Sequence, residues 1–168
     1  FACAGQQLDA RDDDIAGRFG FAAVTVVVLE TDNETASCAV AGMDPPLVRR
    51  TESDSDHCEE IAAGGPLVGV ERDYQYEEVR FSLGPDDILA LATDGITEAR
   101  RGLRGQEFFG IEGLAKALHD ESTITEPSTP RHALNDLARR TVGRAVAFAD
   151  GRRADDMCLL LAQRRAES

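Results

Sequence analysis

Short apolar runs follow one another along the first half of the chain, and they predict β-strands because each is too short for a typical helix. The run 21–30 is rich in β-branched residues, so we expect a buried strand there. Residues 35–41 repeat the pattern after a polar turn, which predicts a hairpin of the two strands. Pro45 and Pro46 then break the pairing, since proline cannot donate to a ladder, and they limit residues 47–49 to a short edge strand.

Further strands are predicted up to the middle of the chain. The segment 58–61 suits another short strand, and residues 74–83 form a longer one. The turn 84–87 leads into the apolar run 88–93, so we expect these last two strands to pair with each other. The pattern is that of antiparallel sheet, in which consecutive strands are joined by short turns.

Helical periodicity appears only in the second half of the chain. A helix is predicted at 96–101, and an apolar stripe at three- and four-residue spacing predicts a second helix around 111–118. Pro130 suits the first position of a longer helix whose apolar face continues to Val146. Residues 155–162 lead into a final apolar strand. Strands come mostly first and helices late, which predicts an α+β fold with antiparallel sheet covered by helices.

The sequence Thr93-Asp94-Gly95 lies where a predicted strand ends and a predicted helix begins. A carboxylate at this junction leaves the edge of the sheet and faces solvent or a cation. Gly95 has no Cβ, so backbone and ligand can approach it closely. The alternative is that Asp94 only caps the helix, because Asp-Gly is a common turn and Asp is a preferred N-cap residue.

Asp155 resembles Asp94 in its position, because it opens the last apolar strand 61 residues later. If the two strands lie side by side and antiparallel, both carboxylates emerge at the same edge of the sheet. Two close carboxylates repel each other, and a divalent cation removes that repulsion. Carboxylate oxygens select hard ions, so the pair predicts Mg²⁺ or Mn²⁺ at Asp94 and Asp155.

The 168 residues include 31 acidic and 18 basic side chains, which gives a formal net charge of −13. This charge disfavours nucleic acid and anionic membrane as partners. No apolar run in the sequence approaches the roughly 20 residues that a membrane span needs. Cys38 and Cys158 fall in apolar strand patterns and are expected as small core residues. The four cysteines are scattered, which indicates reduced thiols in a cytoplasmic protein.

Six stretches in the same order resemble the PPM-type, metal-dependent Ser/Thr protein phosphatases, in the bacterial branch typified by stage II sporulation protein E. They include Ala-Gly-Met-Asp-Pro-Pro at 41–46, Thr-Asp-Gly at 93–95 and Asp-Asp-Met-Cys at 155–158. The resemblance extends over nearly the whole chain and defines one domain at 1–168. The six stretches are 21–30, 39–48, 65–69, 86–99, 109–114 and 155–160.

This resemblance implies an α-β-β-α sandwich, in which two antiparallel sheets lie face to face with helices outside. It implies a binuclear Mn²⁺/Mg²⁺ centre, where metal-activated water attacks a phosphoserine or phosphothreonine. Asp94 matches the metal-binding Asp that follows the Thr-Asp-Gly strand, and Asp155 matches the metal ligand of the terminal Asp-Asp motif. Asp156 is interpreted either as a residue that supports the metal ligands without binding the metal itself or as a hydrogen-bonding residue at the strand entry. The implied partner is a phosphorylated regulatory protein of the anti-sigma-antagonist type.

The chain departs from the family pattern at several positions. The motif that bridges both ions, an Asp followed by Gly, is absent, because neither Asp9 nor the aspartates at 12–14 have that context. The preceding helices are absent too, so the chain resembles the C-terminal two-thirds of a domain. Met43 stands where His is usual, and Cys158 where Thr is usual. These departures favour an alternative, a catalytically inactive phosphatase-like module that binds a regulatory partner. A structural domain without metal is a third alternative.

Overall fold

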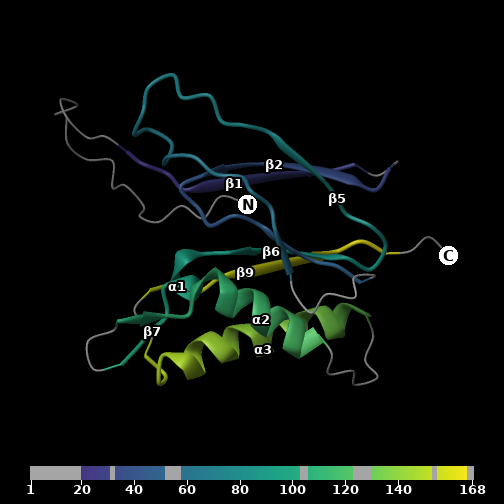
Figure 1. Ribbon diagram of the computed structural model, residues 1–168, viewed down its shortest axis with the longest axis vertical. Helices are drawn as coiled ribbons and strands as arrows, with labels where there is room; N and C mark the ends of the chain where they lie inside the picture. The colour runs from purple at the N-terminus through teal and green to yellow at the C-terminus, as the bar shows by residue number, and fades with distance from the viewer. Residues whose placement is uncertain are drawn as a thin grey trace, which may run out of the picture.

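Two antiparallel sheets lie face to face in the structure, a computed structural model, and helices cover the outer side of one of them (Figure 1). The structure describes residues 20–30, 33–51, 58–102, 106–122, 130–152 and 155–165. Asp9 and the aspartates at 12–14 lie outside these residues. The expectation that they form no metal motif therefore stays a prediction.

The first sheet has the strand order β1-β2-β5. β1 (Val24–Leu29) pairs along its whole length with β2 (Thr35–Ala41), so the predicted hairpin is confirmed. β5 (Val79–Ser82) pairs with the other edge of β2 and is much shorter than the strand predicted at 74–83.

The second sheet has the order β4-β3-β6-β9, and all its pairs are antiparallel. Two expectations are wrong here. β3 is not an edge strand, because β4 and β6 pair with it on either side. β5 and β6 do not form a hairpin, because they belong to different sheets. The strands are β3 (Leu47–Arg49), β4 (Cys58–Glu60), β6 (Ile88–Ala92) and β9 (Leu159–Gln163).

Burial on both faces explains why β3 lies inside the sheet. Leu47 packs into the core on the helical side, whereas Val48, with 0% of its surface exposed, packs into the core between the two sheets. Pro45 and Pro46 precede the strand, so they do not have to donate to its ladder. A strand buried on two faces is stabilised best between two neighbours, and the proline pair does not prevent this.

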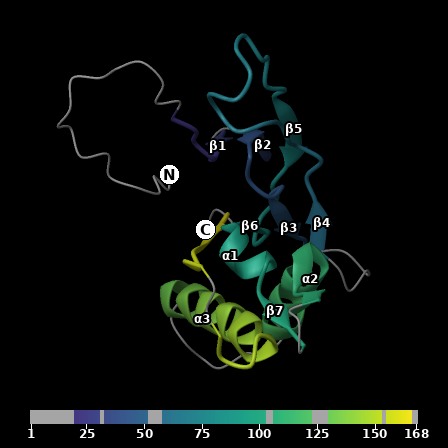
Figure 2. The same cartoon turned by 90° about the vertical axis from the view of Figure 1, so that its left-hand side faces the viewer.

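Two helices, α2 (Gly110–Ser122) and α3 (Pro130–Phe148), cover the outer face of the second sheet (Figures 1 and 2). Leu114 and Leu118 of α2 pack with Ala145 of α3 in the core beneath that sheet. Both helices follow the predicted apolar stripes. No helix in the described part of the chain is long and apolar enough to cross a membrane.

The chain between β6 and α2 differs from the expected single helix at 96–101. α1 (Asp94–Thr97) is only one turn long. A small hairpin follows, in which β7 (Arg100–Arg101) pairs with β8 (Glu107–Phe108). Each of its two arginines lies over a phenylalanine ring, with the guanidinium carbon 4.6 Å from the ring centroid.

The predicted α+β class with two facing antiparallel sheets is confirmed. Among the described residues, helices cover only the second sheet. On β1, Thr25 is buried, whereas Val26 and Val28 are 54% and 55% exposed. The expectation that this strand is buried is therefore wrong for its outer face, and β1 contributes only alternate residues to the core. Cys38 of β2 is buried as expected.

Candidate metal site

The ends of β6 and β9 bring the two predicted metal ligands to one place. The strands pair antiparallel with Ala92 opposite Leu159, so Asp94 follows the end of one strand while Asp155 precedes the start of the other. Both residues line one cavity of about 400 Å³. The expected antiparallel neighbourhood is present, and metal binding at Asp94 and Asp155 stays a prediction.

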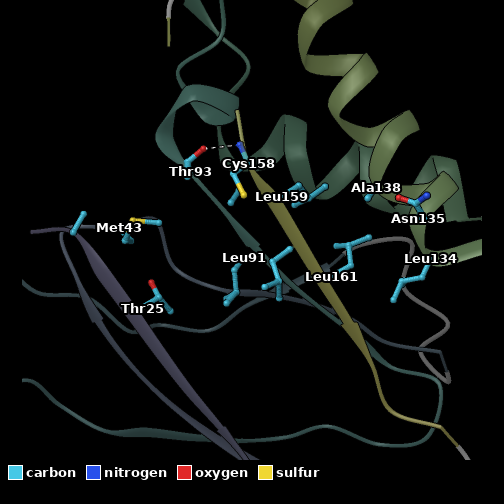
Figure 3. A pocket seen from close by; sticks show the side chains of 13 residues that line it. Thr25, Met43, Leu91, Thr93, Leu134, Asn135, Ala138, Cys158, Leu159 and Leu161 are labelled. Atoms are coloured by element: carbon cyan, nitrogen blue, oxygen red, sulfur yellow. Dashed lines mark hydrogen bonds between the residues drawn. The ribbon is translucent and has the colours of Figure 1, made fainter. Parts of the chain in front are cut away.

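Thr93 forms hydrogen bonds that join the segment carrying Asp94 to the segment carrying Asp155. Its backbone N–H donates to the Cys158 carbonyl at 3.0 Å, and its Oγ1 accepts from the Cys158 N–H at 2.9 Å (Figure 3). The same hydroxyl donates to the Asp156 carbonyl at 3.0 Å. Cys158 contributes backbone groups to this contact while its thiol is exposed, so its predicted place in the core is wrong.

Gly95 is required for this contact because of the backbone that lies against it. A Cβ at position 95 would lie 2.4 Å from the carbonyl oxygen of Asp156, well inside van der Waals contact. The sequence suggested that the missing Cβ admits a ligand. In the structure it admits the main chain of the segment that carries Asp155.

The carboxylate of Asp94 is exposed and takes no part in capping. The N-cap residue of α1 is Thr93, and no side chain donates or accepts a capping hydrogen bond there. Among the described residues, nothing forms a hydrogen bond or ion pair with the Asp94 carboxylate. In Asp155, Oδ1 accepts from the Asp156 N–H at 2.7 Å, which orients the carboxylate. Asp156 therefore acts through its backbone, in agreement with its interpretation as a hydrogen-bonding residue.

Three charged residues in the same cavity were not assigned a role from the sequence: Glu98, Arg100 and Arg152. Arg100 donates to Glu98 at 3.0 Å, so these two neutralise each other. The available signal was their proximity in sequence to Asp94 and Asp155. That signal is weak, because charged residues near a turn are common on any protein surface.

The donor set fits one hard cation better than two. The Asp94 and Asp155 carboxylates, completed by water, suit Mg²⁺ or Mn²⁺, which commonly bind through one or two carboxylates. Within the described ranges, no group of three or more His, Cys, Asp or Glu side chains is placed to hold a metal ion. The third carboxylate that would bridge two ions is therefore not among the described residues.

A larger cavity of about 580 Å³ lies between the first sheet, β9 and α3, and it is apolar (Figure 3). Met43, which stands where the family usually has His, lines it together with Thr25, Leu91 and Leu161. None of the residues lining it is a carboxylate, a histidine or a cation. This cavity therefore lacks the carboxylates that would hold a hard cation.

Comparisons with known proteins agree with this fold. The sequence matches the family described as stage II sporulation protein E over residues 5–165. A comparison with curated protein sequences gives no match. Among solved structures, the phosphatase domain of the cell fate determinant SpoIIE from Bacillus subtilis is similar, with 14% identity and a TM-score of 0.58 over 87% of this chain.

Two further structures are alike in fold. The SiaA-PP2C domain of Pseudomonas aeruginosa has 20% identity and a TM-score of 0.65 over 85% of this chain. The structure of the RsbU and RsbW domains of a Mycobacterium tuberculosis protein has 20% identity and a TM-score of 0.66 over 88% of this chain. The chain spans 58%, 52% and 38% of these three structures, in the order given. The family match over nearly its whole length shows that the chain belongs to the stage II sporulation protein E family.

Proposed function

We propose that the chain is the metal-binding part of a protein serine/threonine phosphatase. The observation that carries this proposal is that Asp94 and Asp155, from segments far apart in sequence, line one cavity in a chain of this family. A bound Mg²⁺ or Mn²⁺ ion supplies Lewis-acid stabilisation of phosphate charge and lowers the pKa of a bound water.

The residues of the chain divide the work of holding that ion. Asp94 and Asp155 provide the carboxylate oxygens. Thr93 fixes the separation of their two segments through its three hydrogen bonds, and Gly95 permits the close approach. The Asp156 N–H holds one oxygen of Asp155, which leaves the other oxygen for the cation.

The proposed partner is a phosphorylated regulatory protein of the anti-sigma-antagonist type. Support comes from the family membership and from the likeness in fold to a structure that contains RsbU and RsbW domains. In the described part of the chain Cys38, Cys58 and Cys158 are free, which supports a cytoplasmic setting for such a partner.

Binding of Mn²⁺ should raise the melting temperature. At a tenfold excess over Kd the ion adds about 1.4 kcal/mol, which corresponds to roughly 3–5 °C for a domain of this size. We expect Asp94→Asn and Asp155→Asn each to remove most of this rise, and the double variant to lose little more, because the two act as a unit. The measurement is a thermal melt of each protein with and without millimolar Mn²⁺.

The matched control is Asp156→Asn, which changes a neighbouring carboxylate that does not line the cavity. This variant should keep the full metal response. A rise that survives in the Asp94/Asp155 double variant would place the cation elsewhere and contradict the assignment. A capping role for Asp94 gives a different result, because Asn caps about as well as Asp and the substitution would be silent with or without metal.

A second candidate function is a phosphatase-like binding module without activity. It is favoured by the two-carboxylate donor set, since a single ion cannot stabilise both the attacking and the leaving oxygen. We therefore expect the 168-residue chain with Mn²⁺ to hydrolyse p-nitrophenyl phosphate poorly or not at all. Robust Mn²⁺-dependent hydrolysis that Asp94→Asn abolishes would instead favour the active enzyme and reject the binding module.

A further inference from the structure

The cavity that contains Asp94 and Asp155 also contains positive charge. Arg100 and Arg152 line it beside three carboxylates, although the chain as a whole carries 31 acidic against 18 basic residues. Arg100 is already occupied, because it pairs with Glu98 and lies over the ring of Phe108. Arg152 is the other cation of this cavity.

Arg152 has an exposed guanidinium on a backbone that is held in place. Its N–H donates to the Ala149 carbonyl at 2.9 Å, and the preceding Gly151 N–H donates to the Val146 carbonyl at 2.9 Å. These bonds continue the end of α3 into a turn at residues 149–152. The side chain forms no hydrogen bond or ion pair with any described residue, even though the exposed carboxylates of Asp94, Glu98 and Asp155 line the same cavity.

This combination suits an anion that enters together with a cation. A phosphate group on its own is repelled by the two carboxylates, and it needs both the metal charge and a further positive group to bind there. Guanidinium recognises phosphate through two parallel N–H···O bonds, which makes arginine better suited than lysine to fix its orientation. An arginine without a carboxylate partner has its donors available for such a contact.

We propose that Arg152 binds the phosphate group of the phosphoprotein substrate at the cavity formed by Asp94 and Asp155. The proposal rests on the phosphatase function proposed above and adds a substrate-binding residue to it. It assigns the residues of the cavity different tasks: the carboxylates of Asp94 and Asp155 hold the cation, and Arg152 holds the anion.

The test is the binding of O-phosphoserine to the full 168-residue chain in the presence of Mg²⁺, measured by isothermal titration calorimetry with serine as the unphosphorylated control. Arg152→Ala should weaken phosphoserine binding by about tenfold or more, the effect of losing charge-assisted hydrogen bonds. Arg152→Lys should retain part of the affinity, because it keeps the charge but loses the two-pronged geometry. Arg139→Ala, at an exposed arginine of α3 outside the cavity, should bind as the wild type does.

Thermal melts of the same proteins with and without Mg²⁺ separate this proposal from the metal assignment. A metal response in both wild type and Arg152→Ala, with phosphoserine binding weakened only in the variant, supports the role of Arg152. Equal phosphoserine affinity in the two proteins overturns it while the metal site stands. Tighter Mg²⁺ binding by Arg152→Ala without loss of phosphoserine affinity also overturns it, because the arginine then only neutralises the carboxylates.

If wild type shows no metal response, the metal assignment fails. Phosphoserine binding that still depends on Arg152 then supports its role as the anion ligand. Absence of phosphoserine binding to the wild-type chain overturns that role.

Discussion

Replacing Gly95 with alanine is expected to lower the free energy of unfolding by about 1–3 kcal/mol, the usual cost of forcing an extra methyl group into a packed position. The new Cβ would lie 2.4 Å from the Asp156 carbonyl oxygen, a backbone atom that cannot rotate away. The segment carrying Asp155 must then move, which separates its carboxylate from that of Asp94. We therefore expect Gly95→Ala to lose the Mn²⁺ response as well as stability, measured by urea denaturation and by melts with and without metal.

The same substitution at Gly143 is the control. Gly143 lies within α3, and a Cβ built there meets nothing within 4 Å. Because alanine is the better helix former, Gly143→Ala should stabilise the chain by about 1 kcal/mol and leave the metal response intact. Opposite signs for the two variants support the contact between Gly95 and Asp156. A Gly95→Ala protein that unfolds like the wild type and responds normally to Mn²⁺ would contradict it.

The predicted strands and long helices were largely found, and so was the hairpin of β1 and β2, but the predicted neighbours of β3 and β5 were wrong. Apolar runs locate β6 because five successive residues, Ile88 to Ala92, are apolar, and such a run needs burial on both faces. The pattern does not say which strands provide that burial. The strand nearest in sequence, β5, belongs to the other sheet, and the true neighbours are β3 and β9. The pairing of strands that are far apart in sequence depends on how side chains pack in the two cores. The local pattern of apolar residues does not contain that information.

The candidate site also contains some residues that the sequence could predict and one that it could not. Asp94 and Asp155 could be proposed from sequence because each lies beside an apolar strand in a motif that resembles the family's. Arg152 could not, because its place in the cavity depends on where α3 ends relative to β9. The sequence predicted a close approach at Gly95, with a ligand as the partner. In the structure the partner is the Asp156 backbone.

Asp87 stabilises the connection through which the chain passes from the first sheet to the second. It is only 7% exposed, and it lies just before β6. Its carboxylate accepts from the Arg50 Nη1 at 2.9 Å, the Thr51 N–H at 3.0 Å and the Gly84 N–H at 3.0 Å. Arg50 Nη1 also donates to the carbonyl of Ser82, the last residue of β5, at 2.6 Å. The buried pair therefore joins the end of β5 to the strands of the other sheet.

Arg50 stays charged in this position. Burial works to lower the pKa of Arg50, but hydrogen bonds and the charges of Glu59 and Asp87 outweigh it and raise the pKa. Removing Asp87 therefore leaves a guanidinium without its buried partner, together with two backbone N–H groups that lose their acceptor. Such groups are costly when water cannot replace the lost contact.

Asp87→Ala is accordingly expected to lower the free energy of unfolding by about 3 kcal/mol, the lower end of the cost of breaking a buried pair, because Glu59 still contacts the same guanidinium. Glu59→Ala is the matched control: it removes the other partner of Arg50, but that side chain is 50% exposed, so the cost should not exceed about 1 kcal/mol. Both losses can be measured by urea denaturation of the full chain. Similar losses for the two variants would mean that burial does not decide the strength of these contacts. A loss confined to Asp87→Ala would instead show that the Asp87 carboxylate stabilises the connection between the two sheets. From the sequence pattern alone, this residue is only part of an ordinary turn.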